Sequence, residues 1–276
     1  MDYIELNIAV ESAEQAEILT AELSELPFDS FVTDKGVLKA YIPQNALVDC
    51  KEDADEILAR YGIVDARYVQ IEAQNWNALW ESNFEPVDVD GRVLIRAPFH
   101  CPSESAEFEV VIMPKMSFGT GHHATTKMMV QMILDSQLEG LHGLDMGSGT
   151  GVLAIAACKC GAKSLDAVDI DDFAYENCIE NLATNGVSER VVPMLGDVRA
   201  IEGRHYDFIL ANINRNILLG DMDAYLRTLN AGGELFISGF LDADVEAMCR
   251  AIEAKGMRLH HTKHIGGWAA LSFVKE

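Results

Sequence analysis

Apolar and polar residues alternate over residues 3–10, which predicts a β-strand with one buried face. The period then lengthens to that of a helix. Ser12 with Gln15 three residues later is a capping-box signature, and it predicts a helix reaching about Leu26. The chain is therefore expected to begin with a strand followed by a helix.

The next segments return to strands and then repeat the helix. Apolar runs at 28–33 and 37–42 flank the turn-forming residues 34–36, as in a β-hairpin. A second helix is predicted to reach about Tyr61, and residues 66–73 alternate again. The order strand, helix, two strands, helix, strand predicts a small ferredoxin-like α+β domain.

Strands and helices alternate along the rest of the chain. Apolar runs predict strands at 93–97, 108–113, 143–146, 164–169, 190–195, 206–212 and 233–239. Helices between the later strands indicate a parallel sheet covered on both faces, that is, a Rossmann-like α/β domain. The segments 258–264 and 268–274 are typical of a terminal hairpin.

A length of 276 residues suits two domains. We expect a ferredoxin-like domain over 1–73, a connecting helix over 74–86 and an α/β domain over 87–276. Trp76 and Trp80 lie four residues apart, which places them on one face of the connecting helix.

Composition narrows the class of protein. No run approaches the roughly 20 apolar residues of a membrane span, and the N-terminus lacks the basic flank of a signal peptide, so a cytoplasmic protein is expected. The six cysteines form no C-x-x-C pair, which favours free thiols over disulfides or structural zinc. Histidines 122–123 and 260–264 are predicted to lie on the surface, and no metal site is expected.

The formal charge of −23 argues against direct binding to nucleic acid, which requires a cationic surface. The acid is concentrated at the N-terminus, where residues 1–84 carry 17 Asp and Glu against 5 Lys and Arg. A cationic partner fits this distribution. The alternative is that excess acid only maintains solubility.

A glycine-rich loop follows the strand at 143–146 and opens the next helix. Its glycines, Gly147, Gly149 and Gly151, have the spacing G-x-G-x-G, and Asp145 precedes them. An acid there repels a pyrophosphate and suits a cation, so the loop favours S-adenosylmethionine, which has an ammonium and a sulfonium but no phosphate, over NAD. The alternative is an ordinary strand-to-helix turn.

Two further acids end neighbouring strands. Asp169 lies 22 residues after Gly147, the spacing of an acid that accepts hydrogen bonds from ribose hydroxyls. Asp197 follows the next strand, where it is either an adenine contact or a turn residue.

A second glycine loop precedes the glycine-rich one. Phe118, Gly119, Thr120 and Gly121 lie just before a helix, and no Gly-Lys-Ser/Thr follows, so the segment is not a P-loop. We expect a mobile loop that closes over a cofactor. A plain helix N-cap is the alternative.

Asn212 ends the predicted strand at 206–212. At the carboxyl end of that strand, its amide oxygen is placed to accept a hydrogen bond from an acceptor amine and to orient the amine for methyl transfer. Asparagine also suits a helix N-cap.

These motifs together resemble the bacterial ribosomal protein L11 methyltransferase family. The resemblance spans nearly the whole chain and rests on the segments 76–86, 118–126, 145–151, 168–171 and 211–213. Its most distinctive element is Phe-Gly-Thr-Gly-His followed by Thr-Thr. The resemblance implies a class I methyltransferase fold preceded by a substrate-recognition domain.

The resemblance also implies site residues and a substrate. Thr126, Gly147, Asp169 and Asn212 match the family's cofactor-binding positions, and the family methylates the α-amino group and lysine side chains of a basic ribosomal protein of the large subunit. Ala124 and residues 214–216 depart from the usual family residues, which affects the acceptor entrance rather than the cofactor site.

The expected chemistry is in-line attack of a neutral amine on the sulfonium methyl group, with Asn212 orienting the amine and no evident general base. Three other functions are compatible with the chain. The first is a methyltransferase of the same fold that acts on another protein or a small molecule. The second is an NAD-dependent oxidoreductase, which Asp145 and the G-x-G-x-G spacing oppose, and the third is a non-catalytic protein that retains the cofactor pocket.

Overall fold

A computed structural model gives the fold of the 276-residue chain. It describes residues 3–71, 84–115 and 117–276. The chain divides into two compact units, Met1–Phe84 and Glu85–Glu276. The predicted connecting helix at 74–86 lies outside the described residues except for 84–86, which are not helical.

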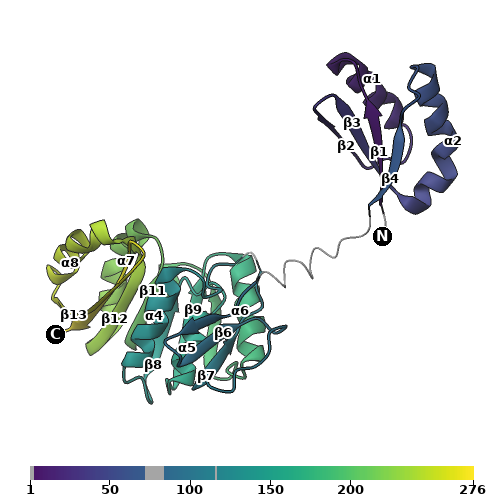
Figure 1. Ribbon diagram of the computed structural model, residues 1–276. Helices are drawn as coiled ribbons and strands as arrows, with labels where there is room; N and C mark the ends of the chain where they lie inside the picture. Colours follow the sequence, from purple (N-terminus) through teal and green to yellow (C-terminus); the bar gives the residue numbers. More distant parts are fainter. Residues whose placement is uncertain (1–2, 72–83, 116) are drawn as a thin grey trace. The chain divides into compact units, whose positions relative to one another are not determined.

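The amino-terminal unit has the predicted βαββαβ order (Figure 1). Its elements are β1 (Tyr3–Ala9), α1 (Ala13–Leu23), β2 (Ser30–Asp34), β3 (Val37–Pro43), α2 (Gln44–Arg60) and β4 (Arg67–Ile71). The strands form an antiparallel sheet in the order β2-β3-β1-β4, and both helices contribute to a single core. The ferredoxin-like prediction is confirmed.

Local sequence accounts for the start of this unit. The alternating residues Ile4 and Leu6 are buried in the core, as the two-residue period requires. Ser12 caps α1 by accepting from the Gln15 backbone N–H at 3.1 Å, whereas the Gln15 side chain accepts from Glu11 rather than from Ser12. The capping box is therefore half formed, and its second bond is shifted by one residue.

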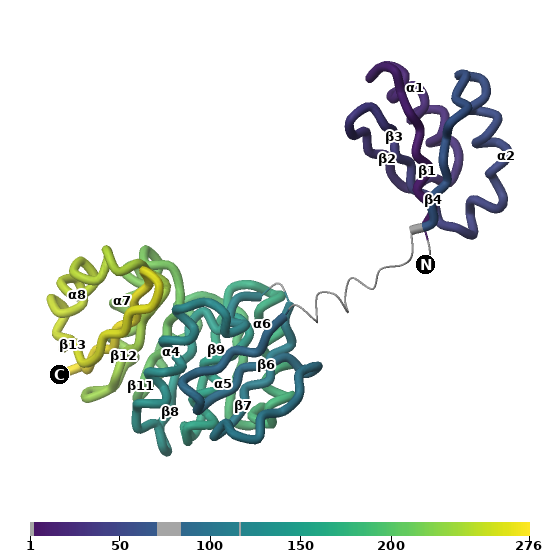
Figure 2. The backbone as a smooth tube through the Cα atoms, viewed as in Figure 1, coloured from purple at the N-terminus to yellow at the C-terminus, as the bar shows by residue number. Residues whose placement is uncertain are grey.

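The larger unit is built on a seven-stranded sheet. Its strands are β8 (His142–Met146), β9 (Ser164–Asp169), β10 (Val191–Leu195), β11 (Tyr206–Asn212), β12 (Leu229–Leu241), β13 (Met257–Ile265) and β14 (Trp268–Lys275). Their order is β10-β9-β8-β11-β12-β14-β13, and β8 to β12 run parallel. The last strand, β14, runs antiparallel between β12 and β13, and Figure 2 shows this yellow hairpin beside β12.

Helices cover both faces of this sheet, as predicted. They are α4 (Ala124–Asp135), α5 (Val152–Lys159), α6 (Asp172–Thr184), α7 (Arg215–Thr228) and α8 (Val245–Glu253), with short 3-10 turns η1 (Val198–Ile201) and η2 (Asp242–Asp244). One core joins α4, α5 and α6 to the sheet, and a second joins η1, α7 and α8 to its other face. Among the described residues, no helix is long and apolar enough to cross a membrane.

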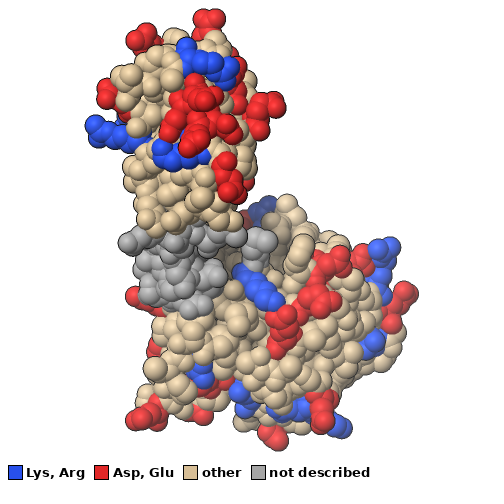
Figure 3. All heavy atoms as spheres, turned by 90° about the vertical axis from the view of Figure 1, so that its right-hand side faces the viewer, with Lys and Arg blue, Asp and Glu red and all other residues tan. Residues whose placement is uncertain are grey.

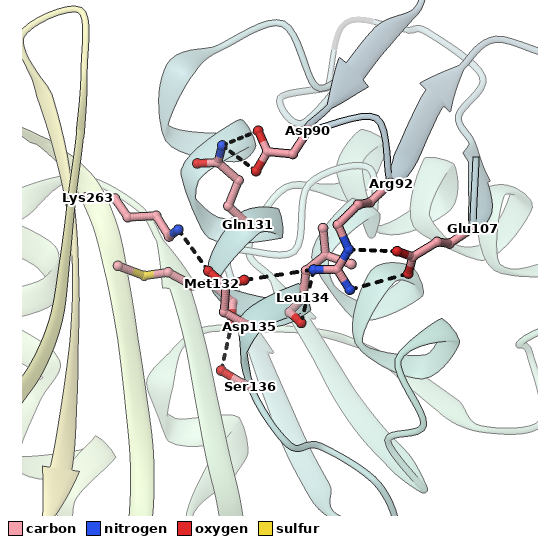
Figure 4. A network of polar contacts seen from close by, with 9 residues as sticks. All are labelled: Asp90, Arg92, Glu107, Gln131, Met132, Leu134, Asp135, Ser136 and Lys263. Atoms are coloured by element: carbon pink, nitrogen blue, oxygen red, sulfur yellow. Dashed lines mark hydrogen bonds and ion pairs between the residues drawn. The ribbon is translucent and has the colours of Figure 1, made fainter. Parts of the chain in front are cut away.

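A small sheet of β5 (Val87–Val89), β6 (Val93–Arg96) and β7 (Phe108–Val111) packs into the first core. Polar contacts tie it to the C-terminal end of α4 (Figure 4). Arg92 forms a two-bond pair with Glu107 and also faces Asp135, which accepts from Lys263 of β13 at 2.9 Å. This network holds the end of α4 that lies away from its N-terminal glycine loop.

Candidate active site

A cavity of about 660 Å³ opens at the carboxyl ends of the parallel strands. Its volume lies within the range of small-molecule sites. The strand order reverses at β8: β9 and β10 follow it on one side, and β11 and β12 lie on the other. The cavity therefore lies at the topological switch point where open α/β sheets bind ligands.

The glycine-rich loop after β8 forms the floor of this cavity. Gly147 has φ +72°, and a Cβ there would lie 2.1 Å from the Ile213 side chain. Gly149 has φ +54°, and a Cβ there would lie 2.3 Å from the Phe118 carbonyl oxygen. These glycines are thus required by neighbouring parts of the protein, in addition to any ligand. Gly151 does not line the cavity; it is the N-cap of α5.

Asp145 lies beneath the loop rather than in the cavity, which corrects the expectation that it faces a cationic ligand. Its side chain is fully buried, and Oδ2 accepts from the Ala154 N–H of α5 at 3.0 Å. Burial raises the pKa of Asp145 to about 7, and the Ala154 hydrogen bond only partly opposes this. Oδ1 has no hydrogen-bond partner among the described residues.

Asp169 lies in the cavity wall and also holds the loop in place. Its Oδ2 accepts from Gly149 N at 2.8 Å and its Oδ1 from Asp171 N at 3.0 Å. A carboxylate has about four acceptor positions, so both oxygens retain capacity for a ligand's hydroxyl groups.

Asp197 caps η1, as the turn alternative predicted, and it also lines the cavity, where the adenine contact stays a prediction. Its carboxylate accepts from the backbone and guanidinium N–H groups of Arg199. The Arg199 side chain lowers the pKa of Asp197 to about 2, so this acid is ionised at neutral pH.

Asn212 ends β11 in the cavity wall. Its Oδ1 is buried and has no hydrogen-bond partner within the described part of the chain. The alternative role as a helix cap belongs to Asn214, whose side chain accepts from Asn216 N at 2.9 Å. A buried amide oxygen without a partner costs about 1–3 kcal/mol, and a donor on a ligand in the cavity that Asn212 lines would offset this cost.

The Phe118 loop contributes less of the cavity than expected. Phe118 lines it, whereas Gly119, Thr120 and Gly121 do not. Thr126 is also absent from the wall, since it is buried at the start of α4. The Thr126 hydroxyl lacks a hydrogen-bond partner among the described residues.

Several wall residues were missed: Trp268 and Asp221 lie outside the motifs, and His123, within the motif at 118–126, was expected on the surface. His123 caps α4 by accepting from Thr125 N, and its ring lies 4.6 Å from that of Trp268 and 5.4 Å from that of Phe118. Trp268 begins β14. Asp221 reaches the cavity from α7, four residues after Ile217. The four-residue spacing was the one available signal, and it does not say which helix face meets the site.

The cavity wall is strongly anionic. Four aspartates line it, Asp169, Asp171, Asp197 and Asp221, and its described residues include no Lys or Arg. Such a wall favours a cationic ligand and disfavours a phosphate. Within the described residues, no group of three or more His, Cys, Asp and Glu is arranged to hold a metal ion.

Residues 5–276 match the family model described as ribosomal protein L11 methyltransferase (PrmA). The chain belongs to this family. It is 41% identical to the ribosomal protein L11 methyltransferase of Porphyromonas gingivalis, over 94% of this chain and 91% of that one. The corresponding protein of Phocaeicola vulgatus is 37% identical over 99% of both.

A solved structure agrees with the sequence relatives. The ribosomal protein L11 methylase of Lactobacillus delbrueckii subsp. bulgaricus has a TM-score of 0.64 and 26% identity, and the match covers 70% of this chain and all of that one. The family resemblance and the methyltransferase fold expected from the sequence are confirmed, and the chain is a methyltransferase.

Proposed function

We propose that this chain transfers methyl groups from S-adenosylmethionine to lysine side chains and the N-terminal amine of ribosomal protein L11. The observation that carries the cofactor assignment is the anionic cavity at the switch point of the sheet. S-adenosylmethionine is a small ligand with two cationic groups and no phosphate, and NAD has the opposite character at its pyrophosphate. The names of the sequence relatives and of the solved methylase support L11 as the substrate.

In this proposal, residues at the ends of neighbouring strands each contact a different part of the cofactor. Asp169 accepts from the ribose hydroxyls, the backbone at Gly147 and Gly149 lies against the amino-acid portion, and Asp197 lies toward the adenine. Asp169 ends β9 and Asp197 follows the neighbouring strand β10, which gives the ribose and adenine adjacent positions in this proposal. Asp145 acts through the loop, because its carboxylate holds the start of α5.

Bound S-adenosylmethionine supplies an electrophilic methyl group, and the protein orients the attacking amine. The Asn212 Oδ1 is the acceptor for the amine N–H, since it is buried at the wall and has no partner among the described residues. Phe118, His123 and Trp268 form an aromatic side of the cavity that limits water around the reacting atoms. Lysine must arrive neutral, and we assign its deprotonation to solvent.

The amino-terminal unit is assigned to recognition of the basic ribosomal protein. Acidic side chains predominate over the face of this unit seen in Figure 3. Helix α2 exposes Asp49, Glu52, Asp53 and Glu56 at spacings of three and four, so they share one helix face. We call these four residues the α2 acidic stripe. This acidic surface is complementary in charge to a basic protein and would repel nucleic acid. We place the reaction in the cytoplasm.

The test of this proposal is mass spectrometry of purified ribosomal protein L11 after incubation with the enzyme and S-adenosylmethionine. Added methyl groups on lysines and the N-terminus are expected, and an Asn212→Ala enzyme is the negative control. Methylation of other proteins in a ribosome-free extract, with L11 unmodified, would show instead a methyltransferase of different substrate class.

The recognition role has its own test. The unit 85–276 alone is expected to bind S-adenosylhomocysteine while methylating intact L11 far more slowly. Glu52→Gln with Asp53→Asn and Glu56→Gln should slow L11 capture mainly at low salt, because exposed charges are screened over about 8 Å at physiological ionic strength. Glu11→Gln with Glu14→Gln and Glu17→Gln, outside the stripe, removes the same charge as a control. Equal effects of both sets would assign the acid to solubility.

A further inference from the structure

Two glycine loops from different parts of the chain pack backbone against backbone at the cavity. Thr150, in the loop after β8, donates its backbone N–H to Phe118 O at 2.9 Å and its Oγ1 hydroxyl to Gly119 O at 2.7 Å. Thr150 is fully buried. One residue therefore holds two consecutive carbonyl groups of the other loop.

The glycines on both sides fit this contact. A Cβ on Gly119 would lie 2.6 Å from Thr150 Oγ1, and one on Gly149 would lie 2.3 Å from Phe118 O. Both distances are below any real Cβ contact, so each loop requires a glycine where the other approaches it. The two motifs, which are about 30 residues apart in the sequence, form one interlocked unit.

A side chain of α6 donates a hydrogen bond to the Thr150 carbonyl. Asn181 is fully buried; it donates from Nδ2 to Thr150 O at 2.9 Å and accepts at Oδ1 from Met113 N at 2.8 Å. One turn further along α6, Asn185 exchanges two hydrogen bonds with the backbone of Val111, at 2.9 and 2.6 Å. The helix thus supplies side-chain amides where a strand would supply backbone groups, and only Asn181 extends this pairing to Thr150.

We propose that Thr150 is a positioning residue that holds the loop of residues 117–121, so that Ser117 and Phe118 form a fixed part of the cavity wall. The loop is then built before the ligand arrives, in contrast to the mobile closing loop expected from its glycines. Holding Phe118 in place fixes the aromatic side of the cavity, and ordering this wall beforehand lowers the entropic cost of binding. This inference rests on the proposed use of S-adenosylmethionine only for the identity of the ligand.

The test compares Thr150→Val, which keeps the shape but removes the hydroxyl, with Thr150→Ser, which keeps the hydroxyl. Calorimetry with S-adenosylhomocysteine should show a Kd about fivefold higher for Thr150→Val, equivalent to about 1 kcal/mol for the lost hydrogen bond. Hydrogen exchange in the ligand-free protein should be faster at the backbone amide of position 150. Thr150→Ser should restore both values even if its melting temperature falls.

Asn185→Ala is the matched control, because it removes pairing to Val111 without touching Thr150. It should lower stability and leave the S-adenosylhomocysteine Kd unchanged. A folded Thr150→Val protein with wild-type Kd and wild-type exchange would overturn the inference. Wild-type protein that fails to bind S-adenosylhomocysteine would contradict the proposed function instead, and the exchange measurement would still decide whether Thr150 holds the loop.

Discussion

The two edges of the seven-stranded sheet treat their polar side chains differently. Toward the amino ends of the strands, Asp166 is nearly fully buried and accepts from Arg204 Nη1 and Tyr206 Oη, both at 2.8 Å. Asp207 at the same edge accepts from His142 N at 2.9 Å and from the Asn230 amide at 2.8 Å. Among the described residues, neither Asp166 nor Asp207 has a buried carboxylate oxygen that lacks a hydrogen-bond partner.

At the carboxyl edge, by contrast, buried polar atoms lack hydrogen-bond partners. Asn212 Oδ1 and Asp145 Oδ1 are buried without a hydrogen-bond partner among the described residues, and four aspartates face one cavity. Buried polar groups in folded proteins are usually paired, so incomplete pairing at one edge has a cost in stability. The comparison indicates that the amino edge serves stability and the carboxyl edge serves a ligand.

The largest expected effect is on turnover at the carboxyl edge. Asn212→Ala should lower single-turnover methylation of L11 about 100-fold with cofactor saturating, because a misdirected amine is a poor nucleophile. Rapid-quench kinetics measure this rate. Asn230→Ala, at the amino edge, is the control and should keep the wild-type rate. An Asn212→Ala enzyme that keeps its rate would remove the residue from the orienting role.

A second effect separates stability from binding at the amino edge. Asp166→Asn preserves shape but removes the charge paired with Arg204, and it should lower the free energy of unfolding by about 2 kcal/mol. Urea denaturation measures this loss, and the affinity for S-adenosylhomocysteine should not change. If the variant bound S-adenosylhomocysteine more weakly under conditions where it is fully folded, the two edges would not be independent.

A third effect is the pH dependence of stability contributed by Asp145. Its folded pKa, about 7, lies above the ordinary aspartate value of 3.8, so the native state holds this proton more tightly than the unfolded state. Stability therefore falls as pH rises from about 4 to 7, and the loss is complete above pH 7. Asp145→Asn keeps an acceptor for Ala154 N–H and removes this loss.

Asp145→Asn should consequently be more stable than the wild type at pH 8, with the difference disappearing near pH 4. Unfolding measured across this range tests the sign. If the stability of the variant relative to the wild type were lower at pH 8 than at pH 4, the buried carboxylate of Asp145 would not be destabilising when ionised.

The sequence predicted the fold well where strands are buried on both faces. The runs at 164–169 and 206–212 match β9 and β11 to the residue, because short buried strands between helices are distinct in a parallel sheet even where an aspartate interrupts the apolar run. The start of β12 was placed at Gly233, yet the strand begins at Leu229, since Leu229 pairs with Tyr206 before an irregular stretch. Gly232 and Gly233 are typical of a turn, so the sequence did not indicate that the strand begins before them.

The site was only partly predictable. Strand ends identified Asp169 and Asn212, but a motif does not say which of its residues face a cavity, and Asp145 and Thr126 are buried instead. Trp268 reaches the wall because β14 inserts antiparallel between β12 and β13, which brings its first residue to the carboxyl edge opposite Leu241. A hairpin pattern alone does not reveal that insertion.

The most direct measurement of the central claim, that the carboxyl edge binds S-adenosylmethionine, is calorimetric titration of the wild type and Asp169→Ala with S-adenosylhomocysteine and with NADH. We expect one S-adenosylhomocysteine bound per wild-type chain, binding at least about tenfold weaker in Asp169→Ala because the ribose hydroxyl groups lose a charged acceptor, and no binding of NADH. Binding of NADH, or an unchanged affinity for S-adenosylhomocysteine in folded Asp169→Ala, would contradict it.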